Sequence, residues 1–272
     1  MRSDPPINLP EPCDVWPKGY TPYDSVEDGI LPRMTMYLPS AEHRTGQSML
    51  VLPGGGYSMV STPKEGHRPA QFLAVHGIAA AVLEYRHAPQ EYPVPLLDAQ
   101  RALRLLRKWA GDQDGLATDQ VGVMGFSAGG HLAGMTATQA SHPEGVIGDD
   151  LDSVSCTPNF FAIIYSVVSM ALASHYMNAV CRKNLLGPEP DEELAERVSI
   201  EKAVTADTPR CFIAHEQFDP AVSIENSIQL YRALTEAGVS STLHAYPGST
   251  HGSGLGANLP WGRDLLEWLA AL

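Results

Sequence analysis

The sequence predicts an α/β fold in which a mostly parallel central sheet carries helices on both faces. Two observations lead to this prediction. Short apolar runs alternate with longer segments of helical spacing over most of the chain. Several of these runs are apolar throughout and stop at proline or glycine, as buried strands that end in tight loops do. Such alternation is typical of parallel sheets that are covered on both sides.

The apolar runs are expected to be the strands of this sheet. The segment 34–38 alternates in polarity and is followed by a proline, and the segment 48–52 stops at Pro53 and three glycines. The complete set of expected strands is 34–38, 48–52, 78–84, 121–124, 160–165, 211–214 and 241–246.

The expected helices are 65–76, 95–110, 127–138, 190–197, 224–237 and 260–272. The segment 95–110 has the clearest helical spacing of apolar residues. Its arginines Arg101, Arg104 and Arg107 are expected to face solvent. In the segment 65–76, the side chains of Phe72, Leu73 and Val75 are expected to form the buried side.

The 272 residues suffice for one large α/β domain, and they show no repeat, low-complexity tract or linker. We therefore expect one domain over 1–272. Residues 1–33, rich in proline and aspartate, are expected to form an irregular arm with at most a short strand. The stretches 141–159 and 166–207 lack clear periodicity. We expect 166–207 to form a small cap or a substrate-facing loop, because long loops without a pattern of their own are often functional.

The chain is acidic, with 18 Lys and Arg against 31 Asp and Glu and a formal charge of −13. Such a surface repels phosphate backbones and anionic lipids, which argues against a nucleic-acid or membrane partner and favours uncharged substrates. No apolar run approaches the roughly 20 residues that span a bilayer. Residues 1–12 lack the apolar region of a signal peptide, which favours a cytoplasmic protein, although a signal removed beforehand would leave the same sequence. A homo-oligomer is compatible with these observations. The four cysteines form no C-x-x-C pair and are expected to be free thiols.

The run Gly125-Phe126-Ser127-Ala128-Gly129 matches the G-x-S-x-G nucleophile elbow of α/β hydrolases. The motif requires a strand before the serine and a helix after it, and both are predicted here. A sharp strand-to-helix turn lifts the serine hydroxyl off the sheet, and the glycines leave room for crowded neighbours. The sequence therefore predicts Ser127 as a nucleophile.

A serine hydroxyl needs a base that takes its proton, and in this fold an acid and then a histidine follow the serine. Asp219 follows the strand that ends at Ala214, and His251 follows the strand that ends at Tyr246. Both lie where the carboxyl edge of the sheet is expected. We therefore predict Asp219 and His251 as the partners of Ser127. The rival acids and histidines after the serine are Asp207, Glu216, Asp264, His215 and His244.

The run Pro53-Gly54-Gly55-Gly56-Tyr57 follows an early buried strand. Consecutive glycines allow backbone amides to approach a ligand closely. We predict that Gly55 or Gly56 supplies one oxyanion donor, beside the amide of Ala128. No Gly-Lys-Ser/Thr follows, so the run is not a phosphate-binding loop. The turn 85–89 is expected to brace this loop, with Asp98 and Arg101 pairing to it, and His131 is expected to pack beneath the elbow.

These motifs together resemble the acetyl esterase and acetylxylan-esterase-like branch of the α/β hydrolases, which is akin to the hormone-sensitive-lipase-like esterases. The resemblance covers residues 50 to 270 and implies the α/β-hydrolase fold with a small or absent cap. It also implies an acyl-serine mechanism without metal or cofactor, and the removal of small acyl groups, often acetyl, from sugars or small esters. The matching segments are 53–57, 85–89, 125–132, 185–187, 219–227 and 251–252.

The sequence departs from that branch after two of its motifs. Val222 is followed by Ser223 rather than the usual proline, and Tyr165 is followed by Ser166 rather than proline. These departures do not touch Ser127, Asp219 or His251, but they leave substrate choice open. A serine peptidase of the same fold and a catalytically silent binding protein stay as alternatives to an esterase.

Overall fold

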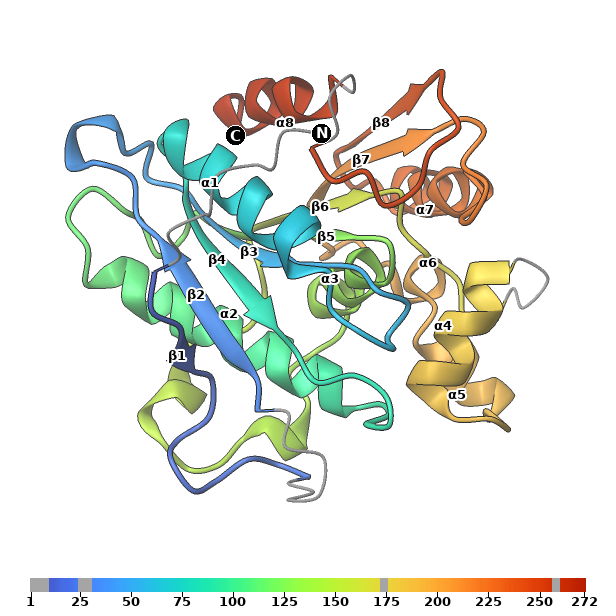
Figure 1. Cartoon of the computed structure of the whole chain (residues 1–272), viewed down its shortest axis with the longest axis horizontal. Coiled ribbons are helices and arrows are strands. Elements are labelled where there is room, and N and C mark those ends of the chain that lie inside the picture. The colour runs from blue at the N-terminus through green and yellow to red at the C-terminus, as the bar shows by residue number, and fades with distance from the viewer. Residues whose placement is uncertain (1–9, 24–30, 172–175, 256–259) are drawn as a thin grey trace, which may run out of the picture.

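The computed structural model describes residues 10–23, 31–171, 176–255 and 260–272. In these residues eight strands form one sheet, in the order β1-β2-β4-β3-β5-β6-β7-β8 (Figure 1). The strands are β1 (Cys13–Asp14), β2 (Arg33–Tyr37), β3 (Ser48–Leu52), β4 (Ala79–Glu84), β5 (Val121–Phe126), β6 (Phe160–Ile164), β7 (Arg210–Glu216) and β8 (Ser241–Tyr246).

The sheet is parallel from β4 to β8, and only β1 and β2 run antiparallel to their neighbours. The carboxyl ends of the parallel strands therefore meet at one edge of the sheet. β5 lies between β3 and β6, so the residue that follows β5 lies at the middle of this edge. This arrangement confirms the mostly parallel sheet that the sequence predicts. The two antiparallel strands, β1 and β2, lie together at one side of the sheet.

Alternate residues of each strand pack against different helices. Leu50 and Leu52 share one apolar cluster with residues of α2 (Val94–Gly111), α3 (Ala128–Thr138) and α7 (Glu225–Glu236). Met49 and Val51 share the other cluster with residues of α1 (Arg68–Val75) and α8 (Trp261–Ala270). Figure 1 shows α1 and α8 together along one side of the sheet. Helices thus cover both faces, as predicted.

The described part of the stretch 166–207 contains three helices, α4 (Tyr176–Leu186), α5 (Glu192–Arg197) and α6 (Ile200–Ala203). Residues 172–175 of this stretch lie outside the described residues. A buried network of side-chain amides ties α4 to the rest of the protein, because Asn178 Nδ2 donates to Asn226 Oδ1 of α7 at 2.8 Å. Of these helices, the sequence pattern predicted only α5, within the expected helix 190–197. It did not predict α4 or α6.

The described part of the N-terminal arm is anchored to α2. Its short strand β1 pairs with β2, and the Trp16 indole donates to Asp98 Oδ1 at 2.7 Å. The Arg101 guanidinium lies over the Trp16 ring, 5.3 Å from its centre. The parts of the arm before residue 10 and between 24 and 30 lie outside the described residues.

The prediction that the arginines of α2 face solvent is wrong. Arg101, Arg104 and Arg107 are only 3%, 4% and 9% exposed. Arg101 forms an ion pair with Asp149. The other two donate to backbone carbonyls between 154 and 157. These contacts satisfy the guanidinium groups inside the protein and fasten the irregular stretch 141–159 to α2.

The expected helix 65–76 is a π-helix (η2, Thr62–His67) followed by α1. Leu73 is buried, but Val75 is 80% exposed, which corrects its expected burial. Residues two apart on an α-helix lie on nearly opposite sides, so Leu73 and Val75 cannot share a buried face.

The four cysteines all lie in the described residues and are free thiols, as expected. Within the described ranges, no helix is both long enough and apolar enough to cross a membrane.

Candidate active site

Ser127 occupies a tight turn between β5 and α3, at the middle of the carboxyl edge. Its backbone is in the positive-φ region, with φ 51° and ψ −120°, which is strained for a residue with a side chain. The flanking glycines are required by space. A Cβ atom at Gly125 would lie 2.1 Å from the carbonyl oxygen of Gly129, and one at Gly129 would lie 2.2 Å from that of Leu52. The local sequence thus forces the turn that presents the serine.

The structure brings the three predicted residues Ser127, His251 and Asp219 together. His251 Nε2 lies 2.9 Å from Ser127 Oγ, and His251 Nδ1 lies 2.7 Å from Asp219 Oδ2. Asp219 comes from the loop after β7 and His251 from the loop after β8. Because these strands are parallel neighbours, their following loops reach the same edge as Ser127.

The carboxyl group of Asp219 is buried and well provided with donors. It accepts hydrogen bonds from the amides of Ala221 and Val222 at 2.8 and 2.9 Å, and His215 Nε2 lies 3.6 Å away. Burial alone raises the pKa of Asp219, but the contacts with His215, His251 and the Val222 amide outweigh it and hold that pKa well below its usual range. Asp219 is therefore a carboxylate that can orient His251 and stabilise it when protonated.

The rival residues have other partners. Glu216 accepts from the backbone amide of Thr250 at 2.6 Å and so supports the loop that carries His251. His215 bonds to Ser227 Oγ and to the Val222 carbonyl, and Asp264 accepts from the hydroxyl of Tyr246. Two rivals remain. Asp207 is exposed, and the ring of His244 lies 3.6 Å from Asp264.

The glycine run lies beside Ser127 and is held in an unusual conformation. Gly55 and Gly56 have φ of +140° and +64°, and both line the same pocket as Ser127. The carbonyl of Gly56 accepts from Asn184 Nδ2 of α4 at 2.7 Å. The carbonyl of Pro53 accepts from the hydroxyl of Tyr85, also at 2.7 Å. Sequence reasoning identified the loop but missed its contact with α4.

The turn after β4 contacts the glycine run only in part as predicted. Besides Tyr85, the amide of Ala88 donates to the Tyr57 carbonyl at 2.8 Å. As expected, Asp98 pairs with this turn through a buried ion pair with Arg86 at 2.7 Å, whereas Arg101 pairs with Asp149 and not with the turn. The turn therefore supports the loop through Tyr85 and Ala88.

Ala128 and His131 occupy the first turns of α3. Ala128 is the first residue of the helix, where backbone amides have no partner within the helix and favour negative charge. His131 lies below it, with its ring nitrogens 2.8 Å from the Tyr57 hydroxyl and 2.9 Å from the Val198 carbonyl. Burial lowers the pKa of His131 to about 4, so it packs beneath the elbow as a neutral ring, as predicted.

The pocket in front of Ser127 has a volume of about 310 Å³. Its wall combines the glycine run, the π-helix η2, the His251 loop and α4, which contributes Met177 and Val180. The described lining residues are Gly55, Gly56, Ser58, Met59, Ser61, Lys64, Glu65, Ser127, Met177, Val180, His251 and Gly252.

Sequence reasoning missed one polar residue of this site, Glu65, and its contact with Tyr165. Glu65 is 3% exposed although it lies on η2, and its carboxylate accepts from the hydroxyl of Tyr165 at 2.8 Å. The sequence pattern does not distinguish a buried glutamate at the start of an expected helix from an exposed one. Only the contacts between distant segments show that Glu65 is buried. In the described part of the chain, no three His, Cys, Asp or Glu side chains are placed to hold a metal ion.

Comparison with known proteins was consistent across sequence and structure. The model of the BD-FAE family matches residues 34–234. An acetylxylan esterase of Xylanibacter ruminicola is 31% identical over 249 residues, which cover 88% of this chain and 48% of that protein. The endo-1,4-beta-xylanase B of Butyrivibrio fibrisolvens is 30% identical over 243 residues, 88% of this chain and 37% of that protein. The chain thus spans about half the length, or less, of these relatives.

Among solved structures, the acetyl ester-xyloside bifunctional hydrolase of Caldicellulosiruptor lactoaceticus is similar over almost its whole length. It is 31% identical, has a TM-score of 0.89, and each chain covers 97% of the other. The likeness therefore includes the sheet, the helices on both faces and α4–α6, and it agrees with the α/β-hydrolase fold that the sequence predicts.

Proposed function

The chain belongs to the BD-FAE family, and we propose that it is a serine carboxylic-ester hydrolase that removes short acyl groups, acetyl above all, from esters of sugars or small alcohols. The observation that carries the proposal is the hydrogen-bonded series Asp219–His251–Ser127, with lengths of 2.7 and 2.9 Å. It lies at the carboxyl edge of the sheet and opens into a pocket that the glycine run also lines.

In the proposed reaction, His251 Nε2 takes the proton of Ser127 Oγ as the oxygen bonds to the acyl carbon. Asp219, held as a carboxylate, stabilises the imidazolium that results. The tetrahedral intermediate then collapses, and His251 gives its proton to the alcohol oxygen as the ester C–O bond breaks. Water attacks the acyl-serine with His251 as base, which releases the acid and restores Ser127.

The negative oxygen of the tetrahedral intermediate needs donors that are already in place. The amide of Ala128, at the start of α3, and an amide of Gly55 or Gly56 are proposed for this role. The glycine run is fixed before substrate arrives by the bonds from Tyr85 and Asn184. Such preorganisation stabilises the developing charge without reorganisation during the reaction.

The dimensions of the pocket support short acyl groups. Its volume of about 310 Å³ is small, and its apolar wall is made of Met59, Met177 and Val180. A Cβ atom at Gly56 would lie only 3.4 Å from Met177 Cε, so α4 closes the space over the glycine run. The printed names of two similar proteins, an acetylxylan esterase and an acetyl ester-xyloside hydrolase, support acetylated sugars as substrates.

The similar solved structure is also named as a xyloside hydrolase. Glycoside hydrolysis generally uses two carboxyl groups that flank the scissile bond. Among the described residues that line the pocket, Glu65 is the one carboxylic acid, and both of its oxygens accept hydrogen bonds inside the protein. This arrangement favours esters over glycosides for the present chain.

A panel of substrates tests the proposal. It contains p-nitrophenyl esters from acetyl to octanoyl, acetylated xylo-oligosaccharides, a feruloyl ester, and a peptide anilide for the alternative of a serine peptidase. We expect kcat/KM to be highest for acetyl esters and to fall with each longer acyl chain, and we expect no turnover of the anilide. Faster cleavage of the anilide would favour a peptidase, and no turnover of any substrate would favour a silent binding protein.

A further inference from the structure

Glu65 is a buried carboxylic acid in the pocket for which the proposed reaction has no role. It lies on the π-helix η2, and π-helical turns are often found at functional sites. Its two oxygens have different partners. Oε1 accepts from the hydroxyl of Tyr165 at 2.8 Å, and Oε2 accepts from the amide of Gly54 at 2.9 Å. Burying a carboxylate is costly, and these two hydrogen bonds offset part of that cost.

The two partners of Glu65 connect it to the two loops that the reaction depends on, because Gly54 belongs to one loop and Tyr165, which follows β6, contacts the other. Gly54 opens the glycine run. The Tyr165 hydroxyl also accepts from the amide of Gly254, at 2.8 Å, in the loop that carries His251. The Tyr165 ring packs against the His251 ring, with centres 5.0 Å apart and planes at 63°. One carboxylate therefore connects the oxyanion loop to the histidine loop.

The carboxylate lies close to the reacting groups. A Cβ atom at Gly54 would lie 2.7 Å from Glu65 Oε2 and 3.0 Å from Ser127 Cβ, and one at Gly252 would lie 3.9 Å from Glu65 Oε1. The space at Gly54, between Glu65 and Ser127, is therefore too small for a side chain. Burial is the largest influence and raises the pKa of Glu65 above its usual value, although the bonds from Tyr165 and Gly54 and the charge of His251 oppose it.

From these contacts we propose that Glu65 is a positioning residue, which holds the glycine run and the His251 loop in register and places a second negative charge near His251. The inference rests on the proposed ester hydrolysis. The charge stabilises the imidazolium that forms when His251 takes the serine proton, and it adds to the charge of Asp219 on the other ring nitrogen.

Among the residues that the structure describes, four titratable groups lie near His251. They are Asp219 after β7, Tyr165 after β6, and Glu65 and the exposed Lys64 of η2. Tyr85 of the turn after β4 also lies near Glu65. Lys64 is exposed and its charge is screened by water, so the two carboxylates dominate the field at the ring.

The test is Glu65→Gln, which keeps the size of the side chain and an acceptor for Gly54 but removes the charge. With p-nitrophenyl acetate, we expect kcat/KM to fall by about 10- to 100-fold, mainly through kcat. We also expect the acid limb of the kcat/KM profile to move to lower pH. Activity falls along this limb as His251 binds a proton, and the protonated ring has lost a neighbouring negative charge.

Two further variants separate charge from packing. Tyr165→Phe breaks the link to the His251 loop and keeps the Glu65 carboxyl group, so kcat/KM on the plateau of the pH profile should fall by about 3- to 10-fold. Glu201→Gln removes a partly buried carboxylate of α6 outside the pocket and should change neither kcat/KM nor the acid limb. Thermal unfolding of each variant shows whether it is folded.

If Glu65→Gln folds and its acid limb does not move, the proposed effect of the Glu65 charge on His251 is wrong, even if activity falls. A kcat/KM within threefold of the unaltered protein in Tyr165→Phe would overturn the link between the loops, and this variant decides the matter if Glu65→Gln does not fold. If the unaltered protein hydrolyses no ester, the proposed function fails before the variants are compared. The two failures are therefore distinguishable.

Discussion

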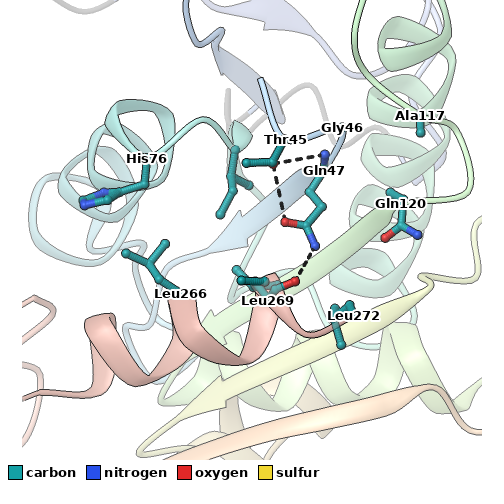
Figure 2. A pocket seen from close by; sticks show the side chains of 11 residues that line it. Thr45, Gly46, Gln47, His76, Ala117, Gln120, Leu266, Leu269 and Leu272 are labelled. Carbon is teal, nitrogen blue, oxygen red and sulfur yellow. Dashed lines mark hydrogen bonds between the residues drawn. The ribbon is translucent and has the colours of Figure 1, made fainter. Parts of the chain in front are cut away.

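The two edges of the sheet each have a cavity, and the larger one lies away from Ser127. At the amino edge, the cavity in Figure 2 has a volume of about 630 Å³, against about 310 Å³ for the pocket at the carboxyl edge. It is lined by residues that precede β3, β4 and β5 and by the last turns of α8.

The polar groups of the amino-edge cavity bond to the ends of helices. Gln47 Nε2 donates to the Leu269 carbonyl at 2.8 Å, as Figure 2 shows, and His76 Nδ1 lies 2.8 Å from the Phe72 carbonyl. At the carboxyl edge, by contrast, side chains from three different loops bond to one another around Ser127. The difference teaches that convergent side chains, rather than volume, mark the site, because parallel strands bring their following loops together at only one edge.

The largest effect that follows from this comparison is expected for Ser127→Ala at the carboxyl edge. Removal of the nucleophile should lower kcat on p-nitrophenyl acetate by about 10⁵-fold or more, because the remaining groups can only assist water. The matched variant Gln120→Ala in the amino-edge cavity should retain full activity. Similar losses of kcat in both variants would contradict the assignment of the active site to the carboxyl edge.

Asp219→Asn is expected to have the next largest effect. The amide keeps the size of the side chain but neither holds His251 in the correct tautomer nor stabilises its protonated form. We expect kcat to fall by about 10⁴-fold with the fold intact. The exposed Asp207→Asn serves as the control in the same assay, and an Asp219→Asn enzyme within tenfold of the control would show that another acid acts.

The buried ring of His131, at the carboxyl edge, should make the unfolding free energy of the protein depend on pH. Its pKa is lowered by burial to about 4, so an unfolded chain binds a proton below about pH 6.5 that the folded chain does not. Stability should therefore fall as pH drops from 6.5 towards 4, by about 3 kcal/mol in total. Urea unfolding at pH 7 and pH 4.5 measures this loss.

The histidine of the amino edge provides the comparison for that measurement. His131→Gln should have a flatter dependence of unfolding free energy on pH between 7 and 4.5. His76→Gln, at an exposed side chain, should leave the dependence as it is in the unaltered protein. Equal slopes in all three proteins would contradict the role given to the buried ring.

The smallest expected effect is that of Gln47→Ala at the amino edge. Loss of the hydrogen bond to the Leu269 carbonyl should lower the unfolding free energy by about 1 kcal/mol, because this carbonyl loses its side-chain donor and keeps only the backbone amides of the last turn. Activity on p-nitrophenyl acetate should be unchanged. A drop in kcat/KM greater than threefold would mean that the two edges are coupled.

Sequence alone predicted the parts of the site that depend on position along the chain. Ser127, Asp219 and His251 each follow a strand that its apolar run reveals, and parallel strands carry the residues after them to one edge. The glycine run was predicted in the same way. The roles of these residues in catalysis stay a proposal, which the variants above test.

The residues that sequence reasoning missed depend on contacts between distant segments. Glu65 is buried because Gly54 and Tyr165 supply donors, and Arg107 is buried because backbone carbonyls between 155 and 157 accept from it. A charged side chain at helical spacing predicts exposure, and only the tertiary structure shows that it has partners inside. The helix α4 was likewise not predicted, because its helical spacing is weak, and the sequence led only to the expectation of a small cap or a substrate-facing loop over 166–207.

The central claim is that Ser127 carries the acyl group during hydrolysis, and its most direct test is to trap that intermediate. The protein is mixed with excess p-nitrophenyl acetate, quenched in acid within milliseconds, digested and analysed by mass spectrometry. The account predicts one acetyl group on the peptide that contains Ser127, located on that serine, and none in Ser127→Ala. An acetyl group on another residue in an active enzyme, or turnover that persists in Ser127→Ala, would contradict it.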